Sequence, residues 1–300
     1  MTQRRLLLVH AHPDDESIGT GATMAHYVDA GVGVTLVTCT AGEMGEVLLP
    51  ELEHLAYEKD GGLGEQRRTE IADAMRILGV TDHRWLGGFG RFHDSGMAWH
   101  ADGHAVAADV VPDTAFWHAD LTEAADELVA VIREVRPQVV VTYDEFGGYG
   151  HPDHVQAHRV TTYAVALAAA RSHRPDLGEP HDVAKLYWTA IPESRMRESL
   201  RAIRESGDTE TFAGMEPDGN LGPMVTPDAL IDARVDGSAV VQRKMDALAA
   251  HRTQVQPDGF FFAGAESGHA FWAQESFRLA KGSVGPVDDD GLEADLFAGV

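Results

Sequence analysis

The stretch LLLVHAHPDDES, residues 6–17, decides the fold class. It begins with the apolar run Leu6–His10, whose length suits a buried strand, and it breaks off into a Pro-Asp turn. A helical pattern around Thr23–Ala30 stops at Gly31, and a second apolar run, Val32–Cys39, follows it. This order of strand, helix and strand is typical of parallel strands joined by crossover helices.

The same rhythm continues along the rest of the chain. Helical spacing is expected at Gln66–Leu78, Leu121–Val135, Pro152 to about Ala170, and Ser238–His251. Further strands are expected at His83–Leu86, Gln138–Tyr143, Lys185–Ile191 and Leu230–Val235. We therefore predict an α/β fold with a Rossmann-like, mostly parallel sheet flanked by helices.

Charge and cysteine usage restrict the classes of function. The chain has 48 acidic and 24 basic residues, and its net charge of −24 repels nucleic acids and anionic membrane surfaces. No apolar run approaches the roughly 20 residues of a membrane span, and the run near the start is too short for a signal-peptide core. The single cysteine, Cys39, fits a reducing compartment. We expect a cytoplasmic protein without nucleic-acid or membrane partners. The aromatic clusters suit either core packing or contacts between copies of the chain, so a homo-oligomer is possible.

Two motifs that are rich in His and Asp follow two of the expected strands. His12-Pro13-Asp14-Asp15-Glu16 comes directly after the first strand, and His151-Pro152-Asp153-His154 comes shortly after Gln138–Tyr143. Both motifs therefore lie beyond the carboxyl ends of parallel strands, where doubly wound sheets bind ligands. If these two strands flank the crevice at which the strand order reverses, the motifs face each other.

The residue types in these motifs suit a divalent metal ion. Two imidazoles and one carboxylate with an open position form a common catalytic zinc set, and the same set also suits Fe(II). Such a metal activates water and polarises a carbonyl, and a neighbouring carboxylate can take the proton. The side chains of Asp14 and Asp15 diverge from one tight turn, so one can be a ligand and the other a base.

The second motif has the pattern of a helix start. Pro152 suits the first turn, which makes His151 the expected cap, and a spacing of three places His151 and His154 on one helix face. One ring can bind metal while the other, protonated, stabilises an oxyanion, with Asp153 available to hold it charged. The spacing leaves open which histidine has which role.

Longer stretches around these motifs resemble a known family. They are HAHPDDES (10–17), VTCTAGEMGEV (37–47), LGGFGRFHDSGMA (86–98), RPQVVVTYDEFGGYGHPDH (136–154) and HRTQV (251–255). They resemble the zinc-dependent deacetylases of N-acetylglucosamine conjugates, the PIG-L/LmbE-like superfamily, and within it the deacetylases of actinobacterial mycothiol biosynthesis. The resemblance implies hydrolysis of the N-acetyl group of an N-acetylglucosaminyl-inositol, a small-molecule glycoside, by a Zn²⁺ enzyme.

The resemblance also assigns roles to residues. It implies that the metal ligands are His12, Asp15 and His154. It makes Asp14 the general base and His151 the charged partner of the oxyanion, oriented by Asp153, while Tyr149 helps to polarise the carbonyl. It suggests that the sugar or inositol is contacted by Arg67, Asp94, Met97 and Glu46.

The same reading divides the chain into two parts. Residues 1–192 are expected to form the Rossmann-like catalytic core with both motifs, and residues 193–300 a smaller α/β portion that completes the substrate cavity. Flexibility is expected around 205–227, which is rich in Gly, Pro, Asp and Glu, and after residue 284, where the tail is acidic. The long connection 87–119 is expected to be functional or mobile.

Three alternative functions differ in testable features. The amidases of mycothiol S-conjugates share both motifs, but they tend to have a lysine after HPDDES-x and a proline in GGYPHPDH, where this chain has Ile18-Gly19-Thr20 and Gly148-Tyr149-Gly150. A non-catalytic sugar-binding or metal-binding module could share the fold but would not need the spare carboxylate of Asp14. A serine hydrolase is disfavoured because no G-x-S-x-G motif occurs.

Overall fold

The computed structural model describes residues 3–100, 104–205, 207, 209, 215–256, 260–262 and 271–300. Its strands are β1 (Arg5–His10), β2 (Gly33–Thr38), β3 (Asp82–Trp85), β4 (Ala98–Trp99), β5 (Ala105–Val106), β6 (Val139–Thr142), β7 (Lys185–Ala190), β8 (Ala233–Asp236) and β9 (Gln274–Lys281). Its α-helices are α1 (Asp15–Asp29), α2 (Leu63–Leu78), α3 (Leu121–Val135), α4 (Gly147–Gly150), α5 (Pro152–Ala169), α6 (Glu193–Glu205) and α7 (Val241–Ala250). The elements that the sequence predicts are therefore present, most of them within a few residues of the expected bounds.

The main sheet has seven strands in the order β3-β2-β1-β6-β7-β9-β8. The pairs from β3 through β7 are all parallel, whereas β9 runs antiparallel to both β7 and β8. The prediction of a mostly parallel α/β sheet is confirmed. The antiparallel edge was not predicted, because the alternating sequence of β9 gives a weaker signal than the buried apolar runs.

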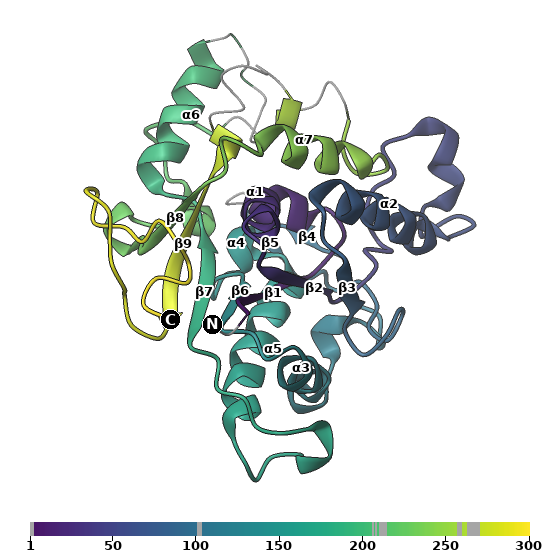
Figure 1. Cartoon of the computed structure of the whole chain (residues 1–300). Coiled ribbons are helices and arrows are strands. Elements are labelled where there is room, and N and C mark those ends of the chain that lie inside the picture. The colour runs from purple at the N-terminus through teal and green to yellow at the C-terminus, as the bar shows by residue number, and fades with distance from the viewer. Residues whose placement is uncertain are drawn as a thin grey trace.

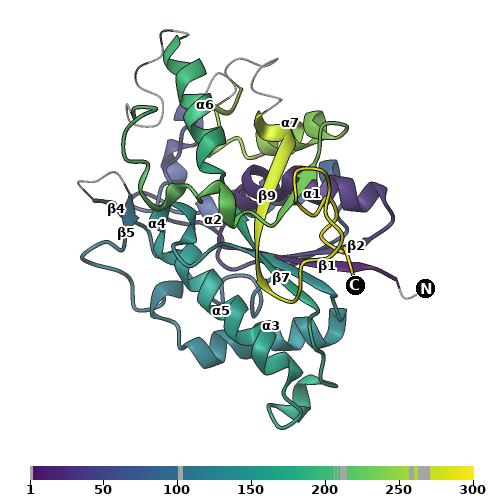
Figure 2. The same ribbon diagram turned by 90° about the vertical axis from the view of Figure 1, so that its left-hand side faces the viewer.

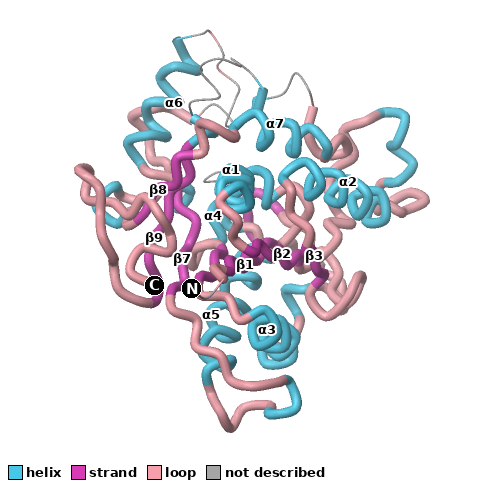
Figure 3. Tube along the Cα trace, in the orientation of Figure 1, coloured by secondary structure: helices cyan, strands magenta, loops and turns pink. Residues whose placement is uncertain are grey.

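Helices cover both faces of the sheet, as Figures 1 and 3 show. Helices α1, α2 and α7 lie on one face, and α3 and α5 lie on the other. Consecutive apolar residues of β1 point to opposite faces of the sheet: Leu6 and Leu8 enter one hydrophobic core, and Leu7 and Val9 enter the other. Both faces therefore need a covering layer of helices. All four side chains are fully buried.

The order of the strands creates the crevice that the sequence predicts. Strand β1 pairs with β2 on one side and with β6 on the other, with Leu6 opposite Val139 and Leu8 opposite Val141. The chain therefore leaves the carboxyl ends of β1 and β6 in opposite directions, which is the arrangement of a ligand-binding switch point. Figure 2 shows α4 and the antiparallel pair β4 and β5 on this side of the sheet.

The C-terminal part of the chain joins the same sheet. Strands β8 and β9 extend it beyond β7, and α7 packs against α1 and α2. The described residues 215–227 fold against α6, where Leu221 packs with Met196 and Leu200. Residues 206, 208 and 210–214, which were also expected to be flexible, lie outside the described residues. No helix in the described part of the chain is long and apolar enough to cross a membrane.

The acidic tail after residue 284 differs from the expectation of flexibility. Leu296 and Phe297 are buried in the core beside Tyr27. The Glu293 carboxylate is fully buried and accepts hydrogen bonds from Lys185 and Tyr187 of β7. A few buried side chains therefore anchor a segment whose average composition is polar.

Replacing Phe297 with alanine tests this anchoring. We expect the free energy of unfolding to fall by about 3–5 kcal/mol, because a buried aromatic ring leaves a cavity in the core. Urea unfolding measures the change, and Val287→Ala, at a half-exposed position of the same segment, is the control. A loss below about 1 kcal/mol for Phe297→Ala would mean that the tail contributes little to the core.

Candidate active site

The first motif forms the turn between β1 and α1. Helix α1 begins at Asp15, earlier than the sequence pattern indicates, and the carbonyl of Asp14 accepts hydrogen bonds from the N–H groups of Ser17 and Ile18. Asp14 has φ 101° and ψ −36°, a conformation that is rare for a residue with a side chain. Such a conformation costs about 1–3 kcal/mol and is typical of functional sites.

The second motif begins α5, as predicted. His151 is the N-cap, its Nδ1 accepts a hydrogen bond from the N–H of Asp153, and Pro152 occupies the first turn. The short helix α4 approaches α5 closely at Gly147, where a Cβ atom would lie 2.7 Å from the Cβ of His154. Gly147 also has φ 66°, so a side chain at this position would be both strained and obstructed.

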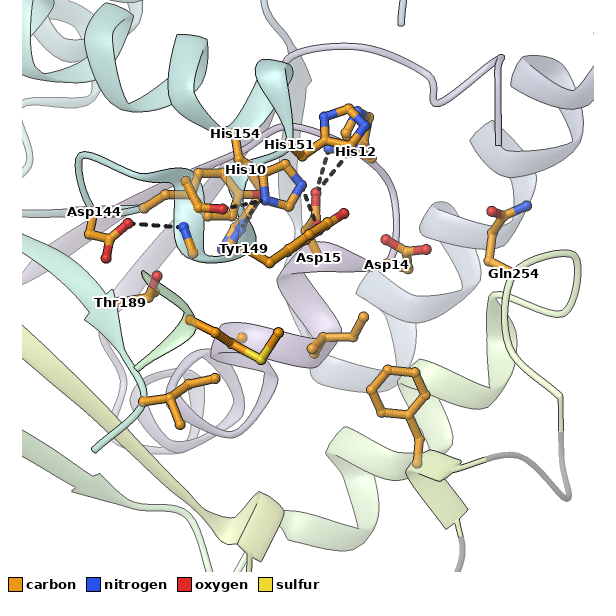
Figure 4. A pocket seen from close by; sticks show the side chains of 18 of the residues that line it. His10, His12, Asp14, Asp15, Asp144, Tyr149, His151, His154, Thr189 and Gln254 are labelled. Atoms are coloured by element: carbon orange, nitrogen blue, oxygen red, sulfur yellow. Dashed lines mark hydrogen bonds and ion pairs between the residues drawn. The ribbon is translucent and has the colours of Figure 1, made fainter. Parts of the chain in front are cut away.

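The two motifs meet at the carboxylate of Asp15 (Figure 4). Its Oδ2 lies 3.2 Å from Nδ1 of His12, and its Oδ1 lies 3.3 Å from Nε2 of His154. The backbone N–H of His12 donates to Oδ2 over 2.8 Å and holds the carboxylate in place. Residues separated by about half the chain are thus brought together, as the strand order requires.

The hydrogen bonds of the two histidines indicate which ring nitrogen is available to a metal ion when the rings are neutral. His12 pairs through its Nε2 with Asp153, and His154 through its Nδ1 with the carbonyl of Gly147, so in a neutral ring that donates through these bonds the remaining nitrogen carries the lone pair. Within the described residues, the buried Nε2 of His154 has no hydrogen-bond partner. Two nitrogen lone pairs and a carboxylate repel one another unless a cation lies between them, so the donor set fits a divalent metal.

The charges around His12 support the same interpretation. Burial disfavours a charged His12, yet the carboxylates of Asp15, Asp153 and Asp94 outweigh it and raise the pKa of His12 well above its usual value. The surroundings therefore favour a positive charge at this point. The nitrogens of His12, His151 and His154 also lie within 4.8 Å of one another, and of these three rings His12 and His154 are the ones paired with the Asp15 carboxylate.

The surroundings of His151 differ from the expectation of a charged ring. Burial lowers its pKa well below the usual value, with a further contribution from the neighbouring His12 and His154. Its Nδ1 is an acceptor for the N–H of Asp153, so a neutral ring carries its proton on Nε2. His151 is therefore arranged to donate a hydrogen bond as a neutral imidazole.

Asp153 does not orient His151 through its carboxylate, which corrects the role that the resemblance implies. Its Oδ2 lies 3.2 Å from Nε2 of His12 and 2.9 Å from the N–H of Ser95, and the Ser95 hydroxyl donates to Oδ1. The first turn of α5 points this side chain toward the first motif, which the spacing of residues alone does not reveal. Asp153 therefore orients His12, in the manner of carboxylates that support metal-binding histidines.

Replacing Asp153 with asparagine is expected to weaken metal binding about 10–100-fold, because His12 loses the charge that orients it and raises its basicity. A chelator competition titration measures this affinity. The control is Asp120→Asn, at the start of α3, where the aspartate caps a helix away from the motifs. Equal metal affinity in the Asp153 variant and the wild type would contradict this role.

Asp14 lies beside this cluster but does not contact the two histidines that flank Asp15. Its Oδ2 pairs with Nη2 of Arg67 at 3.1 Å. Burial raises the pKa of Asp14 to about 6, although the Arg67 guanidinium acts in the opposite direction. A carboxylate with a pKa near neutrality is suited to take and return a proton.

A cavity of about 820 Å³ lies over the cluster, and its wall contains all of the site residues that the sequence predicts except Asp153, which lies behind His12. Asp94 accepts hydrogen bonds from the N–H groups of Met44 and Gly96 and is almost fully buried. Met97 and Glu46 are exposed at the wall. The guanidinium of Arg67 donates to Asp14 and to the backbone of Pro13 and Gly42, so it supports the base as well as the wall.

Sequence reasoning missed several residues of the site. Tyr143, at the end of the strand before the second motif, stacks on His154 with ring centroids 4.3 Å apart, and its hydroxyl accepts from the N–H of Ala11. Ser95, in the long connection 87–119, holds Asp153. The position of Tyr143 at the end of a buried strand was one signal in the sequence. The density of polar residues around Ser95 was the other. The C-terminal part contributes apolar side chains to the cavity wall, among them Met196, Met224, Phe261 and Trp272, together with polar ones such as Arg195 and Glu275.

Comparison with known proteins identifies the family of the chain. Residues 7–165 match the family model described as "PIG-L: GlcNAc-PI de-N-acetylase". A protein from a Nocardioides species named 1D-myo-inositol 2-acetamido-2-deoxy-alpha-D-glucopyranoside deacetylase is 65% identical over 298 residues, which are 99% of each chain. A protein of the same name from Kribbella flavida is 61% identical over 302 residues, covering 100% of this chain and 99% of the relative.

Solved structures show the same fold at low sequence identity. The N,N'-diacetylchitobiose deacetylase from Pyrococcus horikoshii has a TM-score of 0.61 at 19% identity, covering 93% of this chain and 84% of that chain. GalB, a 4-carboxy-2-hydroxymuconate hydratase from Pseudomonas putida, has a TM-score of 0.59 at 16% identity, covering 95% and 100%. Because a hydratase shares this architecture with a deacetylase, the fold alone does not determine the reaction.

Proposed function

The chain belongs to the PIG-L family of de-N-acetylases, and on this premise we propose that it hydrolyses the N-acetyl group of 1D-myo-inositol 2-acetamido-2-deoxy-α-D-glucopyranoside. The products are acetate and the free amine, as in mycothiol biosynthesis. The observation that carries the proposal is the Asp15 carboxylate between the lone pairs of His12 and His154, with the separate carboxylate of Asp14 beside it. The substrate name comes from relatives that match the whole length of the chain.

We infer that His12, Asp15 and His154 hold the metal and that it is zinc, because two imidazoles and one carboxylate form a common catalytic zinc set. Fe(II) suits the same set, so metal analysis of the purified protein decides between them. When bound, the metal supplies Lewis acidity that makes water nucleophilic at neutral pH and polarises the amide carbonyl.

The residues of the chain carry the proton transfers. Asp14 accepts a proton from the attacking water as the new C–O bond forms at the acetamide carbon. It then returns that proton to the amine as the C–N bond breaks. The Nε2–H of His151 is proposed to donate to the oxyanion, and the hydroxyl of Tyr149, whose ring centroid lies 5.1 Å from that of His154, is proposed to assist. Burial raises the pKa of Tyr149, which keeps this hydroxyl protonated.

We propose that the protein acts on the small glycoside in the cytoplasm, without a nucleic-acid or membrane partner, and that a homo-oligomer is compatible with this role. The net charge of −24 disfavours nucleic acid, and a neutral polyol needs no basic surface. Arg67, Asp94, Met97 and Glu46 are proposed to contact the sugar or inositol, because they line the same cavity as the motifs.

A direct comparison of two substrates tests the proposed function. Acetate release from the N-acetylglucosaminyl-inositol is measured beside amide cleavage of a mycothiol S-conjugate, with the same metal-loaded protein. We expect kcat/KM to favour the N-acetyl glycoside. A strong preference for the conjugate would assign the chain to the amidases instead, and no turnover of either substrate would indicate a binding module.

A further inference from the structure

A buried hydrogen-bonded pair behind the first motif is not used by the proposed mechanism. Glu16 and His251 are both fully buried, and Nε2 of His251 lies 2.8 Å from Oε1 of Glu16. Glu16 belongs to the first turn of α1, whereas His251 directly follows α7. The pair therefore connects the catalytic turn to the C-terminal part of the chain.

The other oxygen of Glu16 holds the backbone of the proposed base. Its Oε2 accepts a hydrogen bond of 2.9 Å from the N–H of Asp14, the residue with φ 101°. The Ser17 hydroxyl donates to Oε1, so the carboxylate is held at both oxygens. By accepting a hydrogen bond from the N–H of Asp14, the Glu16 carboxylate stabilises the strained backbone conformation of Asp14.

The hydrogen bond through Nε2 is the contact by which His251 holds Glu16. Among the described residues, its Nδ1 is buried and has no hydrogen-bond partner, so Nε2 carries the interaction of the ring. The backbone carbonyl of His251 accepts from the N–H groups of Gln254 and Val255, which fixes the turn after α7. Gln254 in turn lines the cavity near Asp14 (Figure 4).

We propose that Glu16 and His251 are positioning residues that hold Asp14 in its positive-φ conformation, with its carboxylate at the cavity. Arg67 holds the carboxylate of Asp14 from the side of α2, and Glu16 holds its backbone from the side of α1. Asp15 does not depend on this pair, because its carboxylate is fixed by the N–H of His12. Loss of the pair therefore lowers kcat and leaves metal binding intact.

Two substitutions of His251 separate this role from simple loss of packing. In His251→Gln the amide nitrogen can take the place of Nε2 and donate to Glu16, whereas the shorter side chain of His251→Asn cannot reach it. We expect kcat to fall about 10–100-fold in His251→Asn, since small misplacements of a catalytic group have effects of this size. We expect most of this activity to return in His251→Gln, with KM and metal content at wild-type values in both.

The matched control is another histidine–carboxylate pair. Nε2 of His173 lies 2.6 Å from Oδ1 of Asp126 on α3, and this pair has no connection to Asp14. We expect His173→Asn to change kcat by less than about two-fold. A comparable loss of activity in this control would mean that the effect of His251→Asn reflects general destabilisation.

A double-mutant cycle with Asp14→Asn gives the decisive result. The inference rests on the proposed role of Asp14 as the base, so His251→Asn should cost nothing further in residual turnover once Asp14 is replaced. An equal loss in both backgrounds, or a loss of metal, would overturn the inference. If Asp14→Asn is itself fully active, the proposed base is wrong instead.

If His251→Asn does not fold, a further variant and a crystal structure still test the inference. Glu16→Asp retains a carboxylate that is one methylene too short to reach both Asp14 and His251, and the same loss of kcat and the same cycle are expected. A crystal structure of either variant should show Asp14 with a negative φ. A positive φ as in the wild type would contradict the inference without reference to activity.

Discussion

Replacing Asp14 with asparagine is expected to lower kcat by about 10²–10⁴-fold, the usual contribution of a general base. The amide keeps the volume of the carboxylate but cannot accept a proton from water. Because His12, Asp15 and His154 are untouched, metal content should equal that of the wild type. Steady-state acetate release and metal analysis of the same preparation measure both quantities.

Asp29→Asn, at the exposed end of α1, is the matched control, because it removes a carboxylate from the same helix away from the cavity. It should retain full activity. If Asp14→Asn were equally active, the water would be deprotonated by another group. If the variant lost its metal, Asp14 would be part of the ligand set, contrary to its pairing with Arg67 rather than with the histidines.

Replacing His154 with alanine should abolish metal binding and, with it, measurable turnover. Its Nε2 is one of the lone pairs that face Asp15, and Tyr143 and Gly147 hold the ring in this orientation. Removing one of three protein ligands leaves a site with too few donors for a stable catalytic metal. His12→Ala should behave in the same way, for the same reason.

The control is the other histidine of the second motif. His151→Ala should retain metal, because its ring does not contact the Asp15 carboxylate, and it should lose much of kcat if its Nε2–H stabilises the oxyanion. Isothermal titration with Zn²⁺ separates the two variants. Loss of metal in His151→Ala with retention in His154→Ala would reverse the assignments of these two histidines.

The sequence was sufficient to predict the meeting of the two motifs because it follows from strand order. Buried runs such as Gln138–Tyr143 identify parallel strands, and the carboxyl ends of neighbouring strands in such a sheet lie together. Residue types and spacing predict the candidate ligands, whereas the choice of His154 over His151 came from the family resemblance. Residue type, spacing and strand order can all be recognised in the sequence pattern.

Contacts that depend on exact side-chain direction could not be predicted in this way. The Asp153 carboxylate was expected to contact His151 but pairs with His12 instead, because the first turn of α5 directs it toward the first motif. His251 and Glu16 are 235 positions apart, and no periodicity links them. The tail appeared polar on average, yet the burial of Leu296 and Phe297 was enough to anchor it.

We expect one metal ion to lie between the two motifs, held by His12, Asp15 and His154. A crystal structure of the metal-loaded protein, with anomalous scattering recorded at the absorption edge of the metal, tests this claim directly. We expect one anomalous peak that contacts Nδ1 of His12, the Asp15 carboxylate and Nε2 of His154, with Asp14 outside the ligand set. A peak held instead by His151, or by Nε2 of His12 together with Asp94 and Asp153, would contradict it.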